Sequence, residues 1–199
     1  MSTPEVSKGR DLPLVVIINP ASGSMDGEKR AALCATLEAR GVSFALREVS
    51  SECDATQLAA EAVQLGAREV LVCGGDGTVM GVVNGLAHPP AAGKIAGHTP
   101  PVALSIVPGG TANLLAGALG VPDDLEEAIE IALHGADRVI DLGRCGNSLF
   151  ALGLGLGLTE KLVSQASAVE KEKFGKLAYA HAMLRELGAR PSAFRFKLD

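Results

Sequence analysis

The chain has 199 residues, enough for one sizeable domain or for one domain and part of a second. Hydrophobic residues make up 47% of the chain and charged residues 21%, a composition typical of a globular protein. The formal net charge of −5 argues against nucleic-acid binding, because that needs a basic surface. No apolar run approaches the roughly 18 residues of a membrane span, so we predict no transmembrane segment.

The first part of the chain alternates between apolar runs and helical patterns. The run LVVII at 14–18 predicts a buried parallel strand, and further strands are predicted at 43–49, 68–73 and 102–107. Helices are predicted over 27–40, 55–65 and 78–86, from the turn at 108–111 through 119, and from 123 or 124 to about 135, with N-caps at Asp26, Asp54 and Asp123 or Asp124. This order predicts an α/β fold with a doubly wound parallel sheet.

From about residue 138 the pattern changes. Strands are predicted at 138–143 and 148–158 around a short turn, followed by a charged helix at 160–188 and an alternating strand at 194–198. We therefore predict a first domain over 1–137 and, over 138–199, the beginning of a β-rich domain that is incomplete. The bulky apolar face of the last strand has no partner left in the chain, which predicts a homodimer or aggregation through that edge.

The four cysteines (Cys34, Cys53, Cys73 and Cys145) lie far apart and form no CxxC pair. Disulfides and a zinc site are therefore not expected, and a reducing cytoplasm is the predicted location. Cys73 is predicted to be a small buried residue. Asp141 is expected to be structural, and the histidines are expected to be solvated.

Three glycine-bearing loops follow the first, third and fourth predicted strands, and in a parallel sheet such loops meet at one edge. NPASG supplies Asn19, Ser22 and Gly23; GGDGT supplies Gly74, Gly75, Asp76, Gly77 and Thr78; PGGTAN supplies Gly109, Gly110, Thr111 and Asn113. Glycines let a backbone approach a ligand closely and adopt positive φ, and helix N-termini favour anions. The pattern predicts phosphate binding, although tight strand-to-helix turns would look similar.

The charge of these loops constrains that prediction. None of the three contains lysine or arginine, and neither the GxxxxGK[ST] nor the GxGxxG motif is present. Phosphate would then be met by backbone amides, two helix dipoles and a divalent ion. Asp76 repels phosphate unless it binds Mg²⁺, accepts a hydroxyl proton or bonds a ribose.

The motifs NPASG, GGDGTVMGVVNGL and PGGTANLLA, followed by VIDLG and FALGLGLGL, together resemble the diacylglycerol kinase catalytic domain family. This family includes bacterial lipid kinases and the sphingosine and ceramide kinases. The resemblance covers about residues 13–199, and GGDGT alone is also similar to a motif of phosphofructokinases and NAD kinases. It implies a nucleotide-binding domain of the phosphofructokinase/NAD kinase type over 1–137 and the start of a lipid-binding domain after it.

The resemblance also implies a reaction, in which ATP and Mg²⁺ bind in the cleft and the γ-phosphoryl group moves to diacylglycerol or a similar lipid alcohol at a membrane surface. The enzyme would be cytoplasmic, with peripheral membrane contact. Asp76 would be the catalytic and metal-binding residue. The nucleotide would be held by Asn19, Ser22, Gly23, Gly74, Gly75, Gly77, Thr78, Gly110, Thr111 and Asn113.

Three departures from the family pattern stand out. Met80 and Gly81 occupy positions where the family commonly has Asn and Glu, and Ser24 stands where a basic residue often follows. The family also continues with strands and an Asp-Gly-Glu motif that this chain lacks. These departures predict a C-terminally truncated fragment with weak or no activity alone. The alternatives are an NAD kinase-like phosphotransferase and a non-catalytic nucleotide-binding regulatory module.

Overall fold

The computed structural model describes residues 14–23, 25–87 and 102–153. The chain divides into two compact units, 1–152 and 153–199, and apart from Gly153 the second lies outside the described residues. The helix predicted at 160–188, the strand at 194–198 and its dimerising edge therefore lie outside them as well. Among the described residues, no helix is both long enough and apolar enough to cross a membrane.

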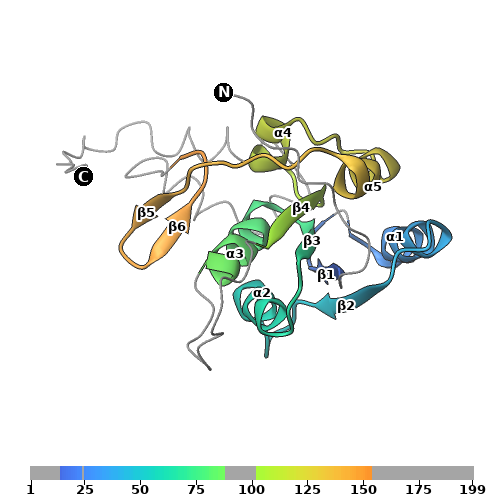
Figure 1. The fold of residues 1–199 in the computed structure, drawn as a ribbon, viewed down its shortest axis with the longest axis horizontal. Coiled ribbons are helices and arrows are strands. Elements are labelled where there is room, and N and C mark those ends of the chain that lie inside the picture. The colour runs from blue at the N-terminus through green and yellow to red at the C-terminus, as the bar shows by residue number, and fades with distance from the viewer. Residues whose placement is uncertain (1–13, 24, 88–101, 154–199) are drawn as a thin grey trace, which may run out of the picture. The chain divides into compact units, whose positions relative to one another are not determined.

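Four parallel strands form the central sheet, in the order β2-β1-β3-β4 (Figure 1). They are β1 (Leu14–Ile18), β2 (Phe44–Glu48), β3 (Glu69–Gly74) and β4 (Ala103–Pro108). Five helices connect or follow them: α1 (Gly27–Ala39), α2 (Ala55–Gln64), α3 (Asp76–Ala87), α4 (Leu114–Leu119) and α5 (Leu125–His134). The α/β fold with a parallel sheet that the alternation predicts is confirmed.

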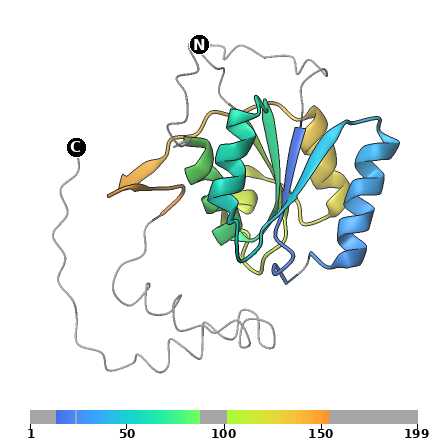
Figure 2. The same ribbon diagram turned by 90° about the horizontal axis from the view of Figure 1, so that it is seen from below.

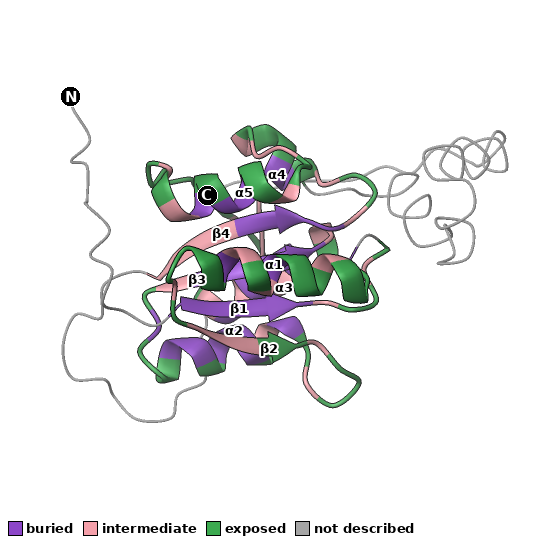
Figure 3. Cartoon of the chain, turned by 90° about the vertical axis from the view of Figure 1, so that its right-hand side faces the viewer, coloured by how far each residue is buried: buried purple, intermediate pink, exposed green. Residues whose placement is uncertain are grey.

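Side chains alternate between the two faces of the sheet and so build two cores. Val15 and Ile17 of β1 pack on the face with α2, α3 and α4, whereas Val16 and Ile18 pack on the face with α1 and α5. Figure 2 shows the resulting layers, with helices on both sides of the strands. Strands β1 and β3 are almost entirely buried, while the edge strand β2 is partly exposed (Figure 3). This double covering explains the continuous apolar runs in the sequence.

Three of the helices begin at the predicted caps. The side chains of Asp26, Asp54 and Asp124 each accept a hydrogen bond from a backbone amide in the first turn of α1, α2 and α5. At Asp54 the arrangement is a complete capping box, because the side chain of Gln57 bonds back to the Asp54 amide. Helix α3 differs from its prediction, since it begins at Asp76 and places that carboxylate inside its first turn.

The strand predicted at 138–143 is wrong. Residues 136–142 form no strand, and the side chain of Val139 is 93% exposed, so the apolar run has no sheet partner among the described residues. The hairpin that follows consists of β5 (Gly143–Cys145) and β6 (Ser148–Phe150), which pair antiparallel. A two-residue turn joins them, with Gly146 at a φ of 60°. The strand predicted at 148–158 is therefore only three residues long within the described part of the chain.

The strand order creates one switch point in the sheet. The chain leaves β1 toward β2 in one direction, then crosses back over β1 to β3 and continues to β4. Strands β1 and β3 are hydrogen-bonded neighbours whose onward connections run to opposite sides. In open α/β sheets, ligands bind outside the carboxyl ends of the strands at such a point. The loops after β1 and β3 lie there.

Candidate functional site

The glycine loops after β3 and β4 pack backbone against backbone. The Gly109 amide donates a 2.9 Å hydrogen bond to the Gly74 carbonyl. A Cβ atom added at Gly110 would lie 2.6 Å from the Cα of Gly75, and one added at Gly109 would lie 3.0 Å from the Cα of Gly74. None of these glycines has positive φ. The predicted use of positive φ in these loops is therefore wrong. Close packing between the loops explains Gly75, Gly109 and Gly110, whereas an added Cβ at Gly74 would meet the Thr78 side chain.

Asp76 forms the second link between the same loops. Its Oδ1 accepts a 2.7 Å hydrogen bond from the Leu114 amide and a longer one, 3.5 Å, from Leu115. The residue preceding α4, Asn113, has a left-handed backbone (φ 47°) and makes no side-chain cap. Its side chain instead bonds the amide and the carbonyl of Gly110. Asp76 therefore caps α4 from a different loop, a role that its sequence position does not reveal.

Asn19 joins the loop after β1 to α3. Its Nδ2 donates a 2.8 Å hydrogen bond to the Oγ1 of Thr78, and its backbone amide donates to the Cys73 carbonyl. Thr78 is 8% exposed and packs against Gly74, where an added Cβ would lie 2.8 Å from the Thr78 Cβ. Ser22 donates its amide to the Asn19 carbonyl and so shapes the turn. These bonds connect the two loops at the switch point of the sheet.

A pocket of about 290 Å³ lies at this switch point, and we call it the switch-point pocket. It is lined by Asn19, Val49, Asp54, Ala55, Thr56, Gly77, Thr78 and Gly81. The N-termini of α2 and α3 both reach it. The first amides of a helix have no partner within the helix, and the helix dipole favours negative charge there. At α2 the Asp54 carboxylate already accepts from the Thr56 and Gln57 amides, so the start of α3 is the end that is open to an anion. Gly77 is exposed and an added Cβ there would meet nothing within 4 Å, so a ligand has room beside the start of α3.

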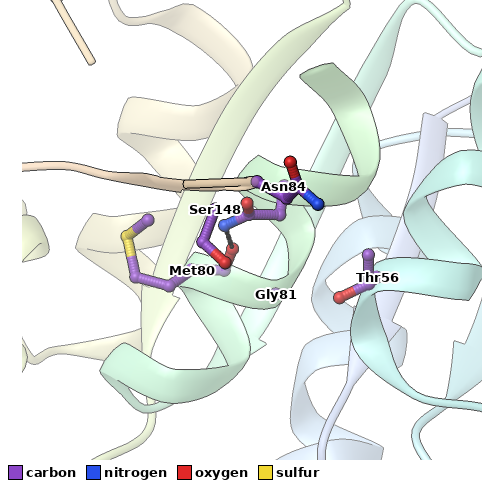
Figure 4. Close-up of a pocket in the computed structure, with 6 residues that line it drawn as sticks. Thr56, Met80, Gly81, Asn84 and Ser148 are labelled. Atoms are coloured by element: carbon purple, nitrogen blue, oxygen red, sulfur yellow. Dashed lines mark hydrogen bonds between the residues drawn. The ribbon is translucent and has the colours of Figure 1, made fainter. Parts of the chain in front are cut away.

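A second pocket, of about 410 Å³, lies between α3 and the β5–β6 hairpin, and we call it the hairpin pocket (Figure 4). Its lining residues are Thr56, Met80, Gly81, Asn84, Asn147 and Ser148. The amide group of Asn84 forms its wall. Asn84 Oδ1 accepts from the Leu149 amide at 2.8 Å, while Nδ2 donates to the carbonyls of Leu149 (3.1 Å) and Met80 (2.8 Å). The Asn84 side chain thus fixes the hairpin on α3.

The predicted site residues fall into three groups. Asn19, Gly77 and Thr78 line the switch-point pocket directly. The loop framework beside it is built by Gly74, Gly75, Asp76, Gly110 and Asn113. The pocket lining does not include Ser22, Gly23 or Thr111.

Sequence reasoning missed Val49, Asp54 and Thr56 as pocket residues. They follow β2, whose carboxyl end lies at the same edge of the sheet, but that loop has no glycine motif to draw attention to it. Asp54 was predicted as a helix cap, but not as a residue that borders the pocket. The parallel strand order was the signal that could have found all three residues.

Cys73 directly precedes Gly74, but it lines neither pocket. It is fully buried, and burial raises the pKa of its thiol to about 12. A neutral, inaccessible thiol is neither a nucleophile nor a metal ligand. The prediction of a small buried residue is confirmed.

Comparison with known proteins identifies the family. An α/β sheet with glycine loops at its switch point is a general phosphate-binding architecture. The family model of the diacylglycerol kinase catalytic domain matches residues 13–145. The chain therefore belongs to the diacylglycerol kinase catalytic domain family, as its motifs predict.

Several curated proteins resemble the chain. A probable YegS-like lipid kinase of Chromohalobacter salexigens is 34% identical over 83% of this chain and 50% of its own length. A diacylglycerol kinase of Bacillus subtilis is 32% identical over 82% of the chain and 52% of its own length. The crystal structure of a diacylglycerol kinase from Bacillus anthracis aligns with 72% of this chain and 47% of its own, at 27% identity and a TM-score of 0.59. The chain spans about half the length of these relatives.

Proposed function

We propose that this chain forms the nucleotide-binding part of an ATP-dependent lipid kinase, which transfers a γ-phosphoryl group to a hydroxyl of diacylglycerol or a similar lipid alcohol. The observation that carries the proposal is the switch-point pocket, where the Asn19–Thr78 hydrogen bond joins two loops beside the start of α3. Membership of the family and the names of the relatives support the reaction class.

The residues present suit a nucleotide that arrives with Mg²⁺. Among the described residues, no group of three or more His, Cys, Asp or Glu side chains could hold an ion alone. Magnesium is commonly bound through one or two carboxylates together with substrate phosphates. Asp76 lies in the GGDGT loop and Asp54 lines the switch-point pocket. The hydrogen bonds that these carboxylates accept from the first turns of α4 and α2 end on Oδ1, which leaves the second oxygen of each for the ion. Bound Mg²⁺ would neutralise phosphate charge.

Residues of the chain would bind the phosphates and assist the transfer. In phosphoryl transfer, the bond between the γ-phosphorus and the bridging oxygen breaks while a bond to the acceptor hydroxyl forms, and the hydroxyl proton leaves. The amides at the start of α3 would hold phosphate oxygens, and Gly77 leaves them accessible. Asp76 would receive the hydroxyl proton or fix the ion. Positioning and charge neutralisation are the main demands of this reaction.

Transfer of radiolabelled phosphate from ATP tests the proposal. Diacylglycerol in mixed micelles is offered in one reaction and NAD in another, both with Mg²⁺. Labelled lipid supports the proposal, and labelled NADP would instead establish the NAD kinase-like alternative. ATP binding by calorimetry without any transfer would indicate the non-catalytic module. In that case the same assay on a full-length relative from Bacillus subtilis provides the positive control.

A further inference from the structure

Two residues belong to both pockets described above. Thr56, in the first turn of α2, and Gly81, in the middle of α3, line the switch-point pocket and the hairpin pocket alike. Figure 4 shows Thr56 on α2 facing Gly81 across the space between the helices. The boundary between the pockets therefore consists of a threonine hydroxyl on one side and a position without a side chain on the other.

The missing side chain at Gly81 keeps this boundary open. A Cβ added there would lie 3.0 Å from the Cβ of Ala55 and 3.5 Å from the Oγ1 of Thr56. Any side chain would thus point from α3 at the first turn of α2, which is where the two pockets meet. Gly85, one turn further along α3, faces the same helix, and a Cβ added there would clash with the Thr56 carbonyl. Gly85 serves helix packing only, since it lines neither pocket, whereas Gly81 also borders the ligand space.

The two pockets differ in chemistry. The switch-point pocket lies at the N-terminus of α3, whose dipole favours anionic groups, whereas the first amides of α2 are already bonded to the Asp54 carboxylate. The hairpin pocket is lined by uncharged residues. Both N–H groups of Asn84 are taken by the carbonyls of Leu149 and Met80, and its Oδ1 already accepts from the Leu149 amide. Its free polar groups belong to Thr56, Asn147 and Ser148. Such a lining suits an uncharged group that forms a few hydrogen bonds and contacts the Met80 side chain.

We propose that the two pockets form one continuous groove, and that Gly81 is the specificity-determining residue that lets one ligand reach across it. The phosphates of that ligand lie at α3, and its uncharged nucleoside part extends toward Asn147 and Ser148. This inference rests on the proposed nucleotide-binding function and adds to it the path of the ligand beyond the phosphates.

The test compares two probes by calorimetry on the full chain. Mg·ADP spans both pockets, whereas Mg·tripolyphosphate occupies only the switch-point pocket. Gly81→Ala should weaken ADP binding about tenfold, which is about 1.4 kcal/mol, and change tripolyphosphate affinity less than about twofold. The double variant Asn147→Ala/Ser148→Ala, at the other end of the groove, should likewise weaken ADP binding and leave tripolyphosphate affinity nearly unchanged. Gly117→Ala is the matched control, because Gly117 lies in α4, outside both pockets, with open space around it.

The outcomes test the groove and the proposed nucleotide-binding function separately. Equal weakening of both probes by Gly81→Ala, with no effect of the hairpin double variant, would show that the residue acts only through α2–α3 packing and would overturn the inference. So would unchanged affinity for both probes in every variant. Wild-type protein that binds neither probe would overturn the proposed nucleotide-binding function itself. Thermal unfolding of each variant confirms that the compared proteins are folded.

Discussion

The Oδ1 atom of Asp76 lies 2.7 Å from the backbone nitrogen of Leu114, across 38 positions of sequence. The carboxylate that the family resemblance assigns to catalysis therefore also caps the first amides of α4, a role that the N-cap residue Asn113 does not fill. A carboxylate at a helix start is favourable both as a hydrogen-bond acceptor and as a charge at the positive end of the dipole. The two roles use different features of the side chain and can be separated by mutation.

Asp76→Asn and Asp76→Ala should therefore behave differently. Asparagine keeps an acceptor for the Leu114 amide, so the fold should lose little stability, while phosphoryl transfer should be abolished with the lost charge. Alanine removes the cap and should lower the free energy of unfolding by about 1–2 kcal/mol. Urea denaturation measures the stability, and transfer is measured in a full-length family member carrying the equivalent changes. Wild-type rates in a folded asparagine variant would contradict the catalytic role.

Gly110→Ala should separate the two glycine loops. The new Cβ would lie 2.6 Å from the Cα of Gly75, which is backbone and cannot rotate away. Overpacking of this kind costs about 1–3 kcal/mol. The matched control is Gly77→Ala, where the added methyl group meets nothing. Thermal unfolding should detect the loss at position 110 only, and equal melting temperatures for the two variants would refute the packing argument.

Asn84→Leu should release the hairpin from α3. The substitution preserves approximate size but removes the partners of both the Leu149 amide and its carbonyl. A lost partner for a partly buried polar group costs about 1–3 kcal/mol. Hydrogen exchange followed by NMR should show loss of protection at Leu149 while the amides of β1 and β3 stay protected. Unchanged exchange at Leu149 would show that β5–β6 pairing alone holds the hairpin.

Asp54 offers a test of a cap that borders the ligand. Asp54→Ala removes the acceptor for the amides of Thr56 and Gln57 and should lower stability by about 1 kcal/mol. Asp54→Asn retains the cap and removes only a negative charge from the switch-point pocket. Tripolyphosphate without Mg²⁺ should then bind the asparagine variant more tightly than wild type. Calorimetry decides, and weaker binding would mean that this carboxylate assists the anion.

The Cys73 thiol should not react with alkylating reagents in the folded protein at pH 8. Its pKa is raised by burial from 9.0 to about 12, so the folded state keeps the proton where the unfolded chain would lose it. Its contribution to stability is therefore complete below pH 9 and falls as the pH rises from 9 toward 12. Mass spectrometry after maleimide treatment should find Cys145, which is exposed, labelled first. Rapid labelling of Cys73 would contradict its burial.

Local signals predicted much of the fold. Some elements depend only on residues close to them in the sequence, and these predictions are confirmed. They are the strand at Leu14–Ile18 and the helix caps at Asp26, Asp54 and Asp124. The strand predicted at 138–143 failed because β-propensity needs a partner, and Val139 has none among the described residues.

The candidate site, too, could be predicted only in part from the sequence. Proximity of the three loops followed from the parallel sheet, but the bond from Asp76 to α4 and the glycine-on-glycine packing connect segments far apart in the chain. No local pattern encodes such pairs. The roles of Val49 and Thr56 were missed for a related reason, since only the assembled sheet brings the loop after β2 beside the start of α3.

The bond between Asn84 and Leu149 also bears on where this fold can be cut. The family match ends at residue 145, yet the partner of a helix α3 side chain lies four positions beyond it. A recombinant piece that stops at 145 would keep every strand of the central sheet but expose the Asn84 amide and remove β6. The shortest self-sufficient piece should therefore extend to residue 152, where the first compact unit ends.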